Sequence, residues 1–310
     1  GHTASLLEDG RVLIAGGENA GGVTNTLELF DPISNTFTLA SGFLSSARKS
    51  HAATALEDGR VLIMGGTDGT STLASSDIYD PTTESVSPGP ALSTGREGLC
   101  AVTQLDGKVF VAGGNNGTDD LSSAEVFDPA VGGFLPLASA LATARRDHQA
   151  FLLPNNNSVL IVGGTARGAV LSSSELYIPW AGTFRPTGSL ASPRVSLTGA
   201  ALTQEGLLLV VGGKDASGAP LSTAELYEFA TVEVDRDDYA PHDTVTIRGM
   251  GWEPDEKVSL LLHEVPTTHA DRRIKTIADP SGNIFEDGFS PKTRDTGVTF
   301  YLTATGARAE

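Results

Sequence analysis

The sequence contains a single cysteine, Cys100, and only 21 lysines and arginines among 310 residues. One cysteine excludes an internal disulfide. The 38 acidic residues leave a formal net charge of −17, which repels phosphate backbones and anionic membrane surfaces. A run of 18 apolar residues is also missing, so no segment is predicted to cross a membrane. We therefore expect neither a nucleic-acid partner nor membrane insertion.

The first residues carry no basic and apolar export leader. Two interpretations stay open, namely a cytosolic chain or an exported chain whose leader is missing. The acidic, lysine-poor composition, rich in threonine, serine and glycine, favours a bacterial exported protein. We predict an extracellular or cell-surface location.

A pair of adjacent glycines recurs at spacings of 49, 48, 50 and 49 residues. A short aliphatic run precedes each pair, and a polar loop and then an aromatic residue follow it. The pairs are Gly16-Gly17, Gly65-Gly66, Gly113-Gly114, Gly163-Gly164 and Gly212-Gly213, and the aromatic residues are Phe30, Tyr79, Phe127, Tyr177 and Tyr227.

Each repeat has the length of one four-stranded propeller blade, because four strands of about five residues with their loops fill roughly 40 to 50 residues. The aliphatic run is apolar on consecutive positions, as in a strand that is covered on both faces. We predict five blades that start near residues 1, 50, 98, 147 and 197. The first four carry an apolar residue for a fourth strand, which the fifth lacks: Phe37, Val86, Phe134 and Phe184.

The aliphatic run, the glycine pair and the spaced aromatic residues resemble the kelch repeats of β-propellers, of the bacterial, galactose-oxidase-like type. Family members usually carry tryptophan at the second aromatic position, where this chain has Phe, Val or no counterpart. The resemblance implies an all-β kelch β-propeller in residues 1–229. Such rings generally hold six or seven blades, so we expect further blades upstream, with a five-bladed ring as the alternative.

From Ala230 the repeat stops, and short alternating strands with Gly and Pro turns begin, which is typical of a β-sandwich. The stretch around Tyr239-Ala240-Pro241 and Trp252 resembles the bacterial immunoglobulin-like repeats of surface proteins. We predict an immunoglobulin-like β-sandwich in residues 230–310, incomplete at its C-terminal end.

Four arginines keep the phase of the repeat: Arg48, Arg96, Arg145 and Arg194. Since the innermost strands of a propeller line its channel, these side chains are candidates for a ligand-binding ring at the channel mouth that could hold carboxylate or sulfate groups. The alternative is that each arginine bonds backbone carbonyls or an aspartate between blades. Recurrence in every blade favours this alternative.

His2, His51 and His148 share a second phase, and Leu99 and Thr198 stand near that place in the other copies. Three imidazoles around an axis could bind a transition metal. Histidines on first strands are more often structural, so we predict no metal. His51 and His148 join the arginines as candidate ligand-binding residues.

The order of the two domains also resembles the copper-radical oxidases, whose cysteine is cross-linked to a tyrosine of the next blade. Cys100 has a suitable position, but His148 stands where the tyrosine is expected, and the sequence has no Tyr-His ligand pair. We therefore predict that Cys100 is a small buried residue and that oxidase chemistry is absent.

Two polar clusters follow the propeller. His263, Glu264, His269 and Asp271 look like metal ligands, but without a helix to hold them we predict a solvated loop. The aspartates at the domain junction could bind calcium, and we expect no other cofactor; they are Asp235, Asp237, Asp238 and Asp243.

These features predict a binding or scaffolding module without catalytic residues, whose loops, such as 115–120 and 215–220, contact a glycan or a protein. A carbohydrate- or alcohol-active enzyme with its site at the channel mouth is one alternative. A structural subunit that self-assembles into a surface layer or filament is another.

Overall fold

The computed structural model describes residues 1–154, 156–202, 206–265 and 269–306. The regular secondary structure of these residues is β-strand, with one 3-10 turn, η2, at Thr293–Asp295. None of the described helices has the length and apolarity that a membrane span requires. The chain divides into two compact units, one of residues 1–150, 159–197 and 212–221, the other of residues 151–158, 198–211 and 222–310.

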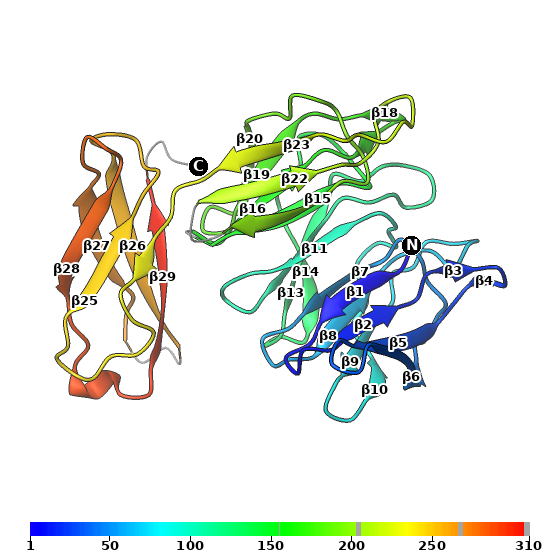
Figure 1. The fold of residues 1–310 in the computed structure, drawn as a ribbon, viewed down its shortest axis with the longest axis horizontal. Helices are drawn as coiled ribbons and strands as arrows, with labels where there is room; N and C mark the ends of the chain where they lie inside the picture. The colour runs from blue at the N-terminus through cyan, green and yellow to red at the C-terminus, as the bar shows by residue number, and fades with distance from the viewer. Residues whose placement is uncertain (155, 203–205, 266–268, 307–310) are drawn as a thin grey trace. The chain divides into compact units, whose positions relative to one another are not determined.

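Four antiparallel sheets of four strands follow the repeat, and their strands carry labels in Figure 1. We call them blades 1 to 4. Blade 1 is β1 (Thr3–Leu6), β2 (Val12–Ala15), β5 (Thr26–Asp31) and β6 (Thr36–Phe43); blade 2 is β7 (Ala52–Ala55), β8 (Val61–Met64), β9 (Ser76–Asp80) and β10 (Ser85–Pro88). Blade 3 is β11 (Cys100–Thr103), β12 (Val109–Ala112), β13 (Ala124–Asp128) and β14 (Gly133–Pro136); blade 4 is β15 (Gln149–Leu153), β16 (Ser158–Val162), β19 (Ser174–Ile178) and β20 (Thr183–Thr187).

The fifth sheet, blade 5, has three strands within the described residues: β21 (Thr198–Leu202), β22 (Leu207–Val211) and β23 (Ala224–Glu228). This matches the missing apolar residue for a fourth strand in the fifth copy. The predicted all-β fold with its repeated sheets is confirmed. Two short hairpins extend from blades 1 and 4: β3 (Glu18–Asn19) with β4 (Gly22–Val23), and β17 (Thr165–Ala166) with β18 (Ala169–Val170).

The hydrophobic core of the first unit lies between consecutive blades. Val61 and Ile63 of β8 pack in one cluster with Leu13 of blade 1, whereas Leu62 and Met64 of the same strand pack with residues of blade 3. Because the second strand of a blade contributes to two clusters, it must be apolar on both faces. This explains the consecutive aliphatic residues before each glycine pair.

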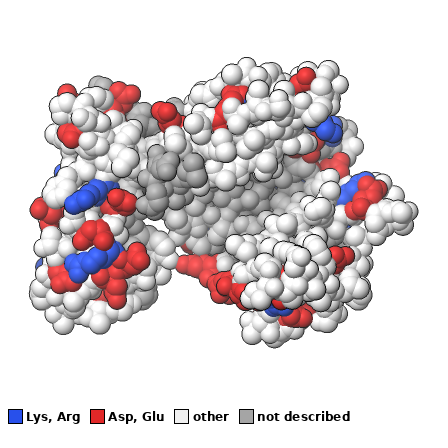
Figure 2. Space-filling view, in the orientation of Figure 1, with Lys and Arg blue, Asp and Glu red and all other residues white. Residues whose placement is uncertain are grey.

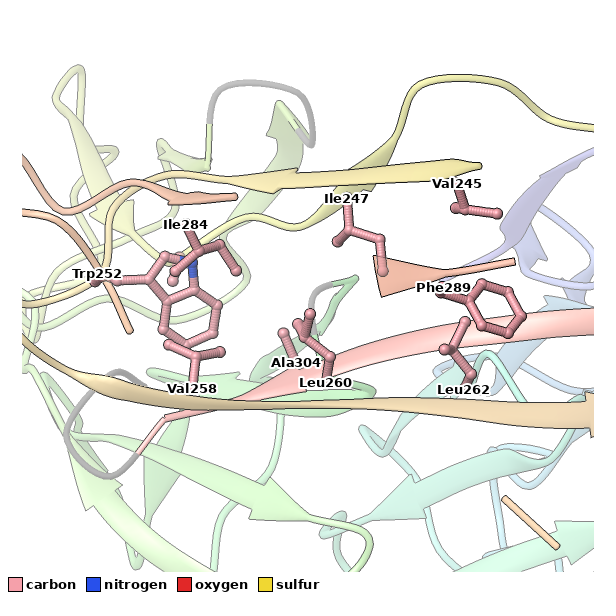
Figure 3. Close-up of a cluster of buried hydrophobic side chains, with 11 residues drawn as sticks. Val245, Ile247, Trp252, Val258, Leu260, Leu262, Ile284, Phe289 and Ala304 are labelled. Carbon is pink, nitrogen blue, oxygen red and sulfur yellow. The ribbon is translucent and has the colours of Figure 1, made fainter. Parts of the chain in front are cut away.

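The C-terminal strands form two three-stranded sheets. One sheet holds β24 (Glu233–Val234), β25 (Val245–Gly249) and β28 (Ile284–Phe289); the other holds β26 (Lys257–Val265), β27 (Arg272–Ile277) and β29 (Thr299–Thr305). Side chains from both sheets, among them Ile247 and Leu260, point toward one another in a shared core (Figure 3). The domain boundary at residues 229 and 230 and the immunoglobulin-like class stay predictions.

Candidate functional site

The recurring arginines lie in the loops that lead from one blade into the next, and their side chains are 0% exposed. Arg48 follows blade 1, and its guanidinium group reaches into blade 2. Its Nη1 donates to the carbonyl oxygens of Gly65 at 2.8 Å and Ser75 at 3.0 Å. Its Nη2 donates to Ser75 Oγ at 3.2 Å and Asp77 Oδ2 at 2.8 Å.

Arg96 and Arg145 repeat this geometry. Arg96 donates to the Gly113 and Ser123 carbonyls, to the Ser123 hydroxyl and, at 2.8 Å, to Glu125 Oε1. Arg145 donates to the corresponding groups of blade 4 and pairs with Glu175 Oε1, also at 2.8 Å. We call each set of a glycine carbonyl, a serine carbonyl and hydroxyl and a carboxylate an arginine socket.

The carboxylate of each socket also accepts a backbone N–H from the residue three positions before the arginine. The donors are Ser45 to Asp77, Ser93 to Glu125 and Ala142 to Glu175. Arg194, after blade 4, is equally buried and donates from Nη1 to the Gly212 carbonyl at 3.0 Å. The loops that end in Arg48, Arg96 and Arg145 therefore each enter a socket as a four-residue segment whose last residue is arginine.

Such sockets satisfy the charge and the hydrogen bonds of an arginine that is removed from water. Burial lowers the pKa of Arg48, Arg96 and Arg145, and the adjacent carboxylates oppose that shift. The geometry favours the alternative in which each arginine bonds carbonyls and an acidic side chain between blades. Ligand binding by the four arginines stays a prediction, and their buried side chains offer it no accessible donor.

Two histidines of the second phase, His51 and His148, are also buried, whereas His2 is exposed. The Nε2 atoms of His51 and His148 lie 2.9 Å from Thr3 Oγ1 and 3.1 Å from Cys100 Sγ, each in the preceding blade. Burial lowers the pKa of both imidazoles to about 3, with a further contribution from Arg48 or Arg145. Both are therefore neutral at pH 7.

Leucine takes the place of these histidines at the starts of blades 3 and 5. A Cβ added to the first glycine of each pair would meet His51 from Gly16, Leu99 from Gly65, His148 from Gly113 and Leu197 from Gly163. The residue in this position in the fifth copy is thus Leu197, which adjoins the Thr198 that the sequence placed near it. Interchange of histidine with leucine indicates packing, whereas a metal ligand could not be replaced by an aliphatic side chain.

Cys100 is buried, as the sequence predicted, and its thiol donates to the Ala112 carbonyl at 3.6 Å. Burial raises the pKa of the thiol to about 12, so the nucleophilic thiolate does not form at neutral pH. With a neutral His148 beside it, this pair lacks the ionised state of a Cys-His nucleophile.

The polar cluster of the C-terminal strands differs in part from the prediction. His263 lies in strand β26 and not in the predicted solvated loop; its side chain is partly exposed and pairs with Asp271 at 2.8 Å. Glu264, by contrast, is fully buried, because burial alternates along β26 and this residue falls on the inward face. Its Oε2 accepts a hydrogen bond from the His269 backbone N–H at 3.0 Å. Asp295 lies nearby, so that one potential ligand atom from each of Glu264, His269 and Asp295 falls within 4.8 Å of the other two.

Two of the junction aspartates, Asp235 and Asp243, are engaged by protein donors. Asp235 Oδ1 accepts from the Tyr239 hydroxyl at 2.7 Å and the Thr246 backbone at 2.8 Å, and Asp243 pairs with Arg236 at 3.2 Å. These aspartates fall outside the one group of potential metal ligands found among the described residues. Calcium binding there stays a prediction.

A polar groove of about 570 Å³ opens between the loop that joins β8 to β9 and the loop that joins β12 to β13. Hydroxyl, amide and backbone groups dominate its walls, with one lysine and one glutamate, and no aromatic residue is among the described residues that line it. We call it the loop groove; it is lined by Lys49, Thr67, Gly69, Thr70, Ser71, Thr72, Glu97, Asn116, Gly117 and Thr118.

Side-chain turns hold the two loops of the groove in shape. Asp68 Oδ1 accepts the backbone N–H groups of Thr70 and Ser71, and Asn116 Oδ1 accepts those of Thr118 and Asp119. The second loop is the 115–120 segment that the sequence indicated. The first was missed, although its position after the glycine pair is the same. On the face shown in Figure 2, large uncharged areas carry scattered acidic residues and few basic ones.

Comparison with known proteins agrees with this architecture. The Kelch motif family matches residues 98–132, which contain the first three strands of blade 3. A solved structure of the protein YjhT is similar to 74% of this chain and 80% of its own, with a TM-score of 0.61 and 17% identity. No curated protein matches the chain by sequence. At this identity the likeness concerns the fold alone, and the chain has the all-β fold of a kelch-type β-propeller.

Proposed function

We propose that this protein is a bacterial, extracellular or cell-surface binding or scaffolding module without catalytic activity, which holds a glycan or a protein segment in the loop groove. The observation that carries the proposal is the composition of the groove. Its hydroxyl, amide and backbone groups match ligands that are themselves rich in hydroxyls or amides.

The charges in the groove favour a neutral ligand. Lys49 and Glu97 both line it, and Lys49 already pairs with Glu18 at 2.7 Å. A strongly anionic or cationic ligand would find little uncompensated charge of the opposite sign there. The absence of aromatic side chains from the described lining favours contacts through hydrogen bonds over stacking on a sugar ring.

The reactive residue types support a non-catalytic role. Cys100, His51 and His148 are buried, and burial shifts the pKa of each group toward its neutral form. A catalytic acid, base or nucleophile must reach its substrate. The enzyme at the channel mouth and the surface-layer subunit stay predictions without a supporting contact. For residues 230–310 we propose an immunoglobulin-like spacer, supported by two sheets around one core.

The experiment is a screen of the purified protein against glycan and peptide arrays, followed by titration of each hit. Ser71→Arg and Thr118→Arg place a long cation in the groove from either loop, and each should lower affinity at least tenfold. Thr82→Arg is the matched control, because Thr82 is equally exposed but lies on the turn between β9 and β10. Hits whose affinity is the same in all three variants would exclude the loop groove as the binding site.

A further inference from the structure

One face of blade 1 differs from the same face of the next three blades. In blades 2, 3 and 4, the first and third residues of the aliphatic run are fully buried against the preceding blade; they are Val61, Ile63, Val109, Val111, Val159 and Ile161. Their counterparts in blade 1, Val12 and Ile14, are only partly buried. This face of blade 1 therefore lacks the cover that its equivalents have.

The uncovered face is apolar over its whole width. Cross-strand register aligns Leu6 with Val12, Val12 with Phe30, and Phe30 with Phe37. Leu6 is 69% exposed and Phe37 is 61% exposed, although both lie in strands. A continuous apolar face of this kind marks an interaction surface.

The same face carries an arginine socket without an arginine. Glu28 is opposite Ile14 in the register, as Asp77 is opposite Ile63 in blade 2. The Gly16 backbone donates to the Thr26 carbonyl at 3.0 Å, as Gly65 does to Ser75 at 3.1 Å. Blade 1 thus presents a glycine carbonyl, a carbonyl and hydroxyl from Thr26, and a carboxylate. We call this set the Glu28 socket.

The Glu28 socket is open. Glu28 is exposed, and among the described residues its carboxylate has neither a hydrogen bond nor an ion pair, whereas Asp77, Glu125 and Glu175 are buried and paired. A pocket of about 190 Å³ lies over these groups, with Gly16, Thr26, Glu28 and Ile14 in its wall. Three filled copies of the same arrangement show which group it accommodates.

We propose that the Glu28 socket binds the arginine of a Ser/Ala-x-x-Arg segment carried by a further blade-type sheet, whose apolar face covers blade 1. The guanidinium donates to the Gly16 and Thr26 carbonyls, the Thr26 hydroxyl and the Glu28 carboxylate. The first residue of the segment donates its backbone N–H to the same carboxylate. The occupant is not one of the four recurring arginines of this chain, because all four are buried at their own junctions.

The socket selects arginine over lysine. In the filled socket of Arg48, the two terminal nitrogens of the planar guanidinium group donate hydrogen bonds to four oxygen acceptors, two from each nitrogen. An ammonium group offers its donors from a single atom and cannot span that set. The apolar face selects in addition for a partner with a complementary sheet, as in the clusters between blades 1 and 2.

The direct test is to titrate the 310-residue protein with the peptide Leu-Ser-Ser-Ala-Arg and to measure binding by NMR or fluorescence. This peptide has the sequence of residues 44–48. We expect saturable binding that falls at least tenfold when the peptide arginine is replaced by lysine, and equally with the Glu28→Gln protein. Glu8→Gln, on the turn after β1, is the control and should bind as the unchanged protein does. Equal binding of the arginine and lysine peptides, or full binding by Glu28→Gln, would overturn the proposal.

A second experiment tests the proposal in case the five-residue peptide is too short to bind measurably. A copy of residues 98–146 placed ahead of Gly1 keeps the repeat in phase and presents the Arg145 loop to the Glu28 socket. We expect a higher unfolding temperature than in the same fusion with Arg145→Ala in the copy or with Glu28→Gln. If all three fusions unfold at one temperature, the socket holds no arginine. A separate protein as the occupant would be distinguished by its co-purification with the 310-residue chain and its release by Glu28→Gln.

Discussion

The Nε2 atom of His148 lies 3.1 Å from the Sγ atom of Cys100, across the boundary between blades 3 and 4. The equivalent contact between blades 1 and 2 joins His51 to Thr3. Both imidazoles fill the space beside a glycine pair that leucine fills at the other junctions. The pair of sulfur and imidazole, which in isolation suggests catalysis, is one of a series of packing contacts.

The first prediction concerns the ion pair of Arg96 with Glu125. Arg96→Met leaves a carboxylate buried without its guanidinium, and we expect a loss of about 3 to 5 kcal/mol in the free energy of unfolding. The double variant Arg96→Met, Glu125→Leu removes both charges and should recover part of that loss. Urea denaturation of the two proteins measures the difference. A double variant less stable than Arg96→Met would contradict the buried pairing.

The second prediction is that His148→Leu is tolerated. Leu99 and Leu197 occupy the equivalent place, so the substitution should change the free energy of unfolding by less than about 1.5 kcal/mol. His148→Asp is the control, because a carboxylate there would be buried without a partner. A large loss with leucine would mean that the contact with Cys100 has a role beyond packing.

The third prediction is a pH dependence. The pKa of His51 and His148 is about 3 in the folded protein, below the ordinary value of 6.5. Between these values the unfolded state binds more protons, so these two groups make stability fall as the pH drops from 6.5 toward 3 and leave it constant above about pH 7. Each contributes a slope of up to about 1.4 kcal/mol per pH unit.

The measurement is chemical denaturation at several pH values between 4 and 8. The variant His51→Leu, His148→Leu should show a shallower slope below pH 6.5 and the same behaviour above it. Equal slopes in the two proteins would show that these imidazoles are protonated in the folded state.

The fourth prediction concerns the glycine pairs. Gly66 has a φ of +88°, and a Cβ there would lie 2.6 Å from the Lys49 carbonyl oxygen. Gly10 has a φ of +85° with no atom within 4 Å of such a Cβ, so it is a matched control. Gly10→Ala reports backbone strain alone, and Gly66→Ala should cost about 1 to 3 kcal/mol more. Thermal unfolding of both variants gives the steric part as the difference.

The fifth prediction is that Cys100 does not react with iodoacetamide in the folded protein. The thiol is buried and its pKa is raised to about 12. Labelling followed by mass spectrometry should show modification only after denaturation. Rapid labelling under native conditions would place the thiol at the surface or give it a lower pKa.

The strand order of the blades could be predicted from the sequence because each cue is local. A glycine pair with positive φ and an aliphatic run before it are set by residues within one repeat. Burial of both faces of each aliphatic run could be predicted too, because the run is apolar at consecutive positions. The sequence also shows leucine, as Leu99, at the position that His148 takes in the next repeat. In the fifth repeat it indicated Thr198, one residue after Leu197, which fills the position in the structure.

The carboxylates of the arginine sockets could not be assigned from local cues. Asp77, Glu125 and Glu175 recur at spacings of 48 and 50 residues on the third strand, but an acidic residue in a strand reads as solvent-facing. Burial of these groups depends on an arginine 29 or 30 residues earlier in the chain. A search for acidic positions in phase with the arginines would have found them. Glu264 was named in the sequence, but its burial was not predicted, because the segment was assigned to a loop and not to a strand with alternating burial.

The arginine sockets give the array of blades a direction. Every filled socket takes its cation from one repeat and its anion from the next, so a duplicated repeat brings one of each and leaves no charge uncompensated within the enlarged protein. Loss of a whole repeat is balanced in the same way. Gene duplication or deletion in steps of about 49 residues is therefore electroneutral at each junction, whereas an insertion that shifts the phase would disrupt the ion pairs on both of its sides.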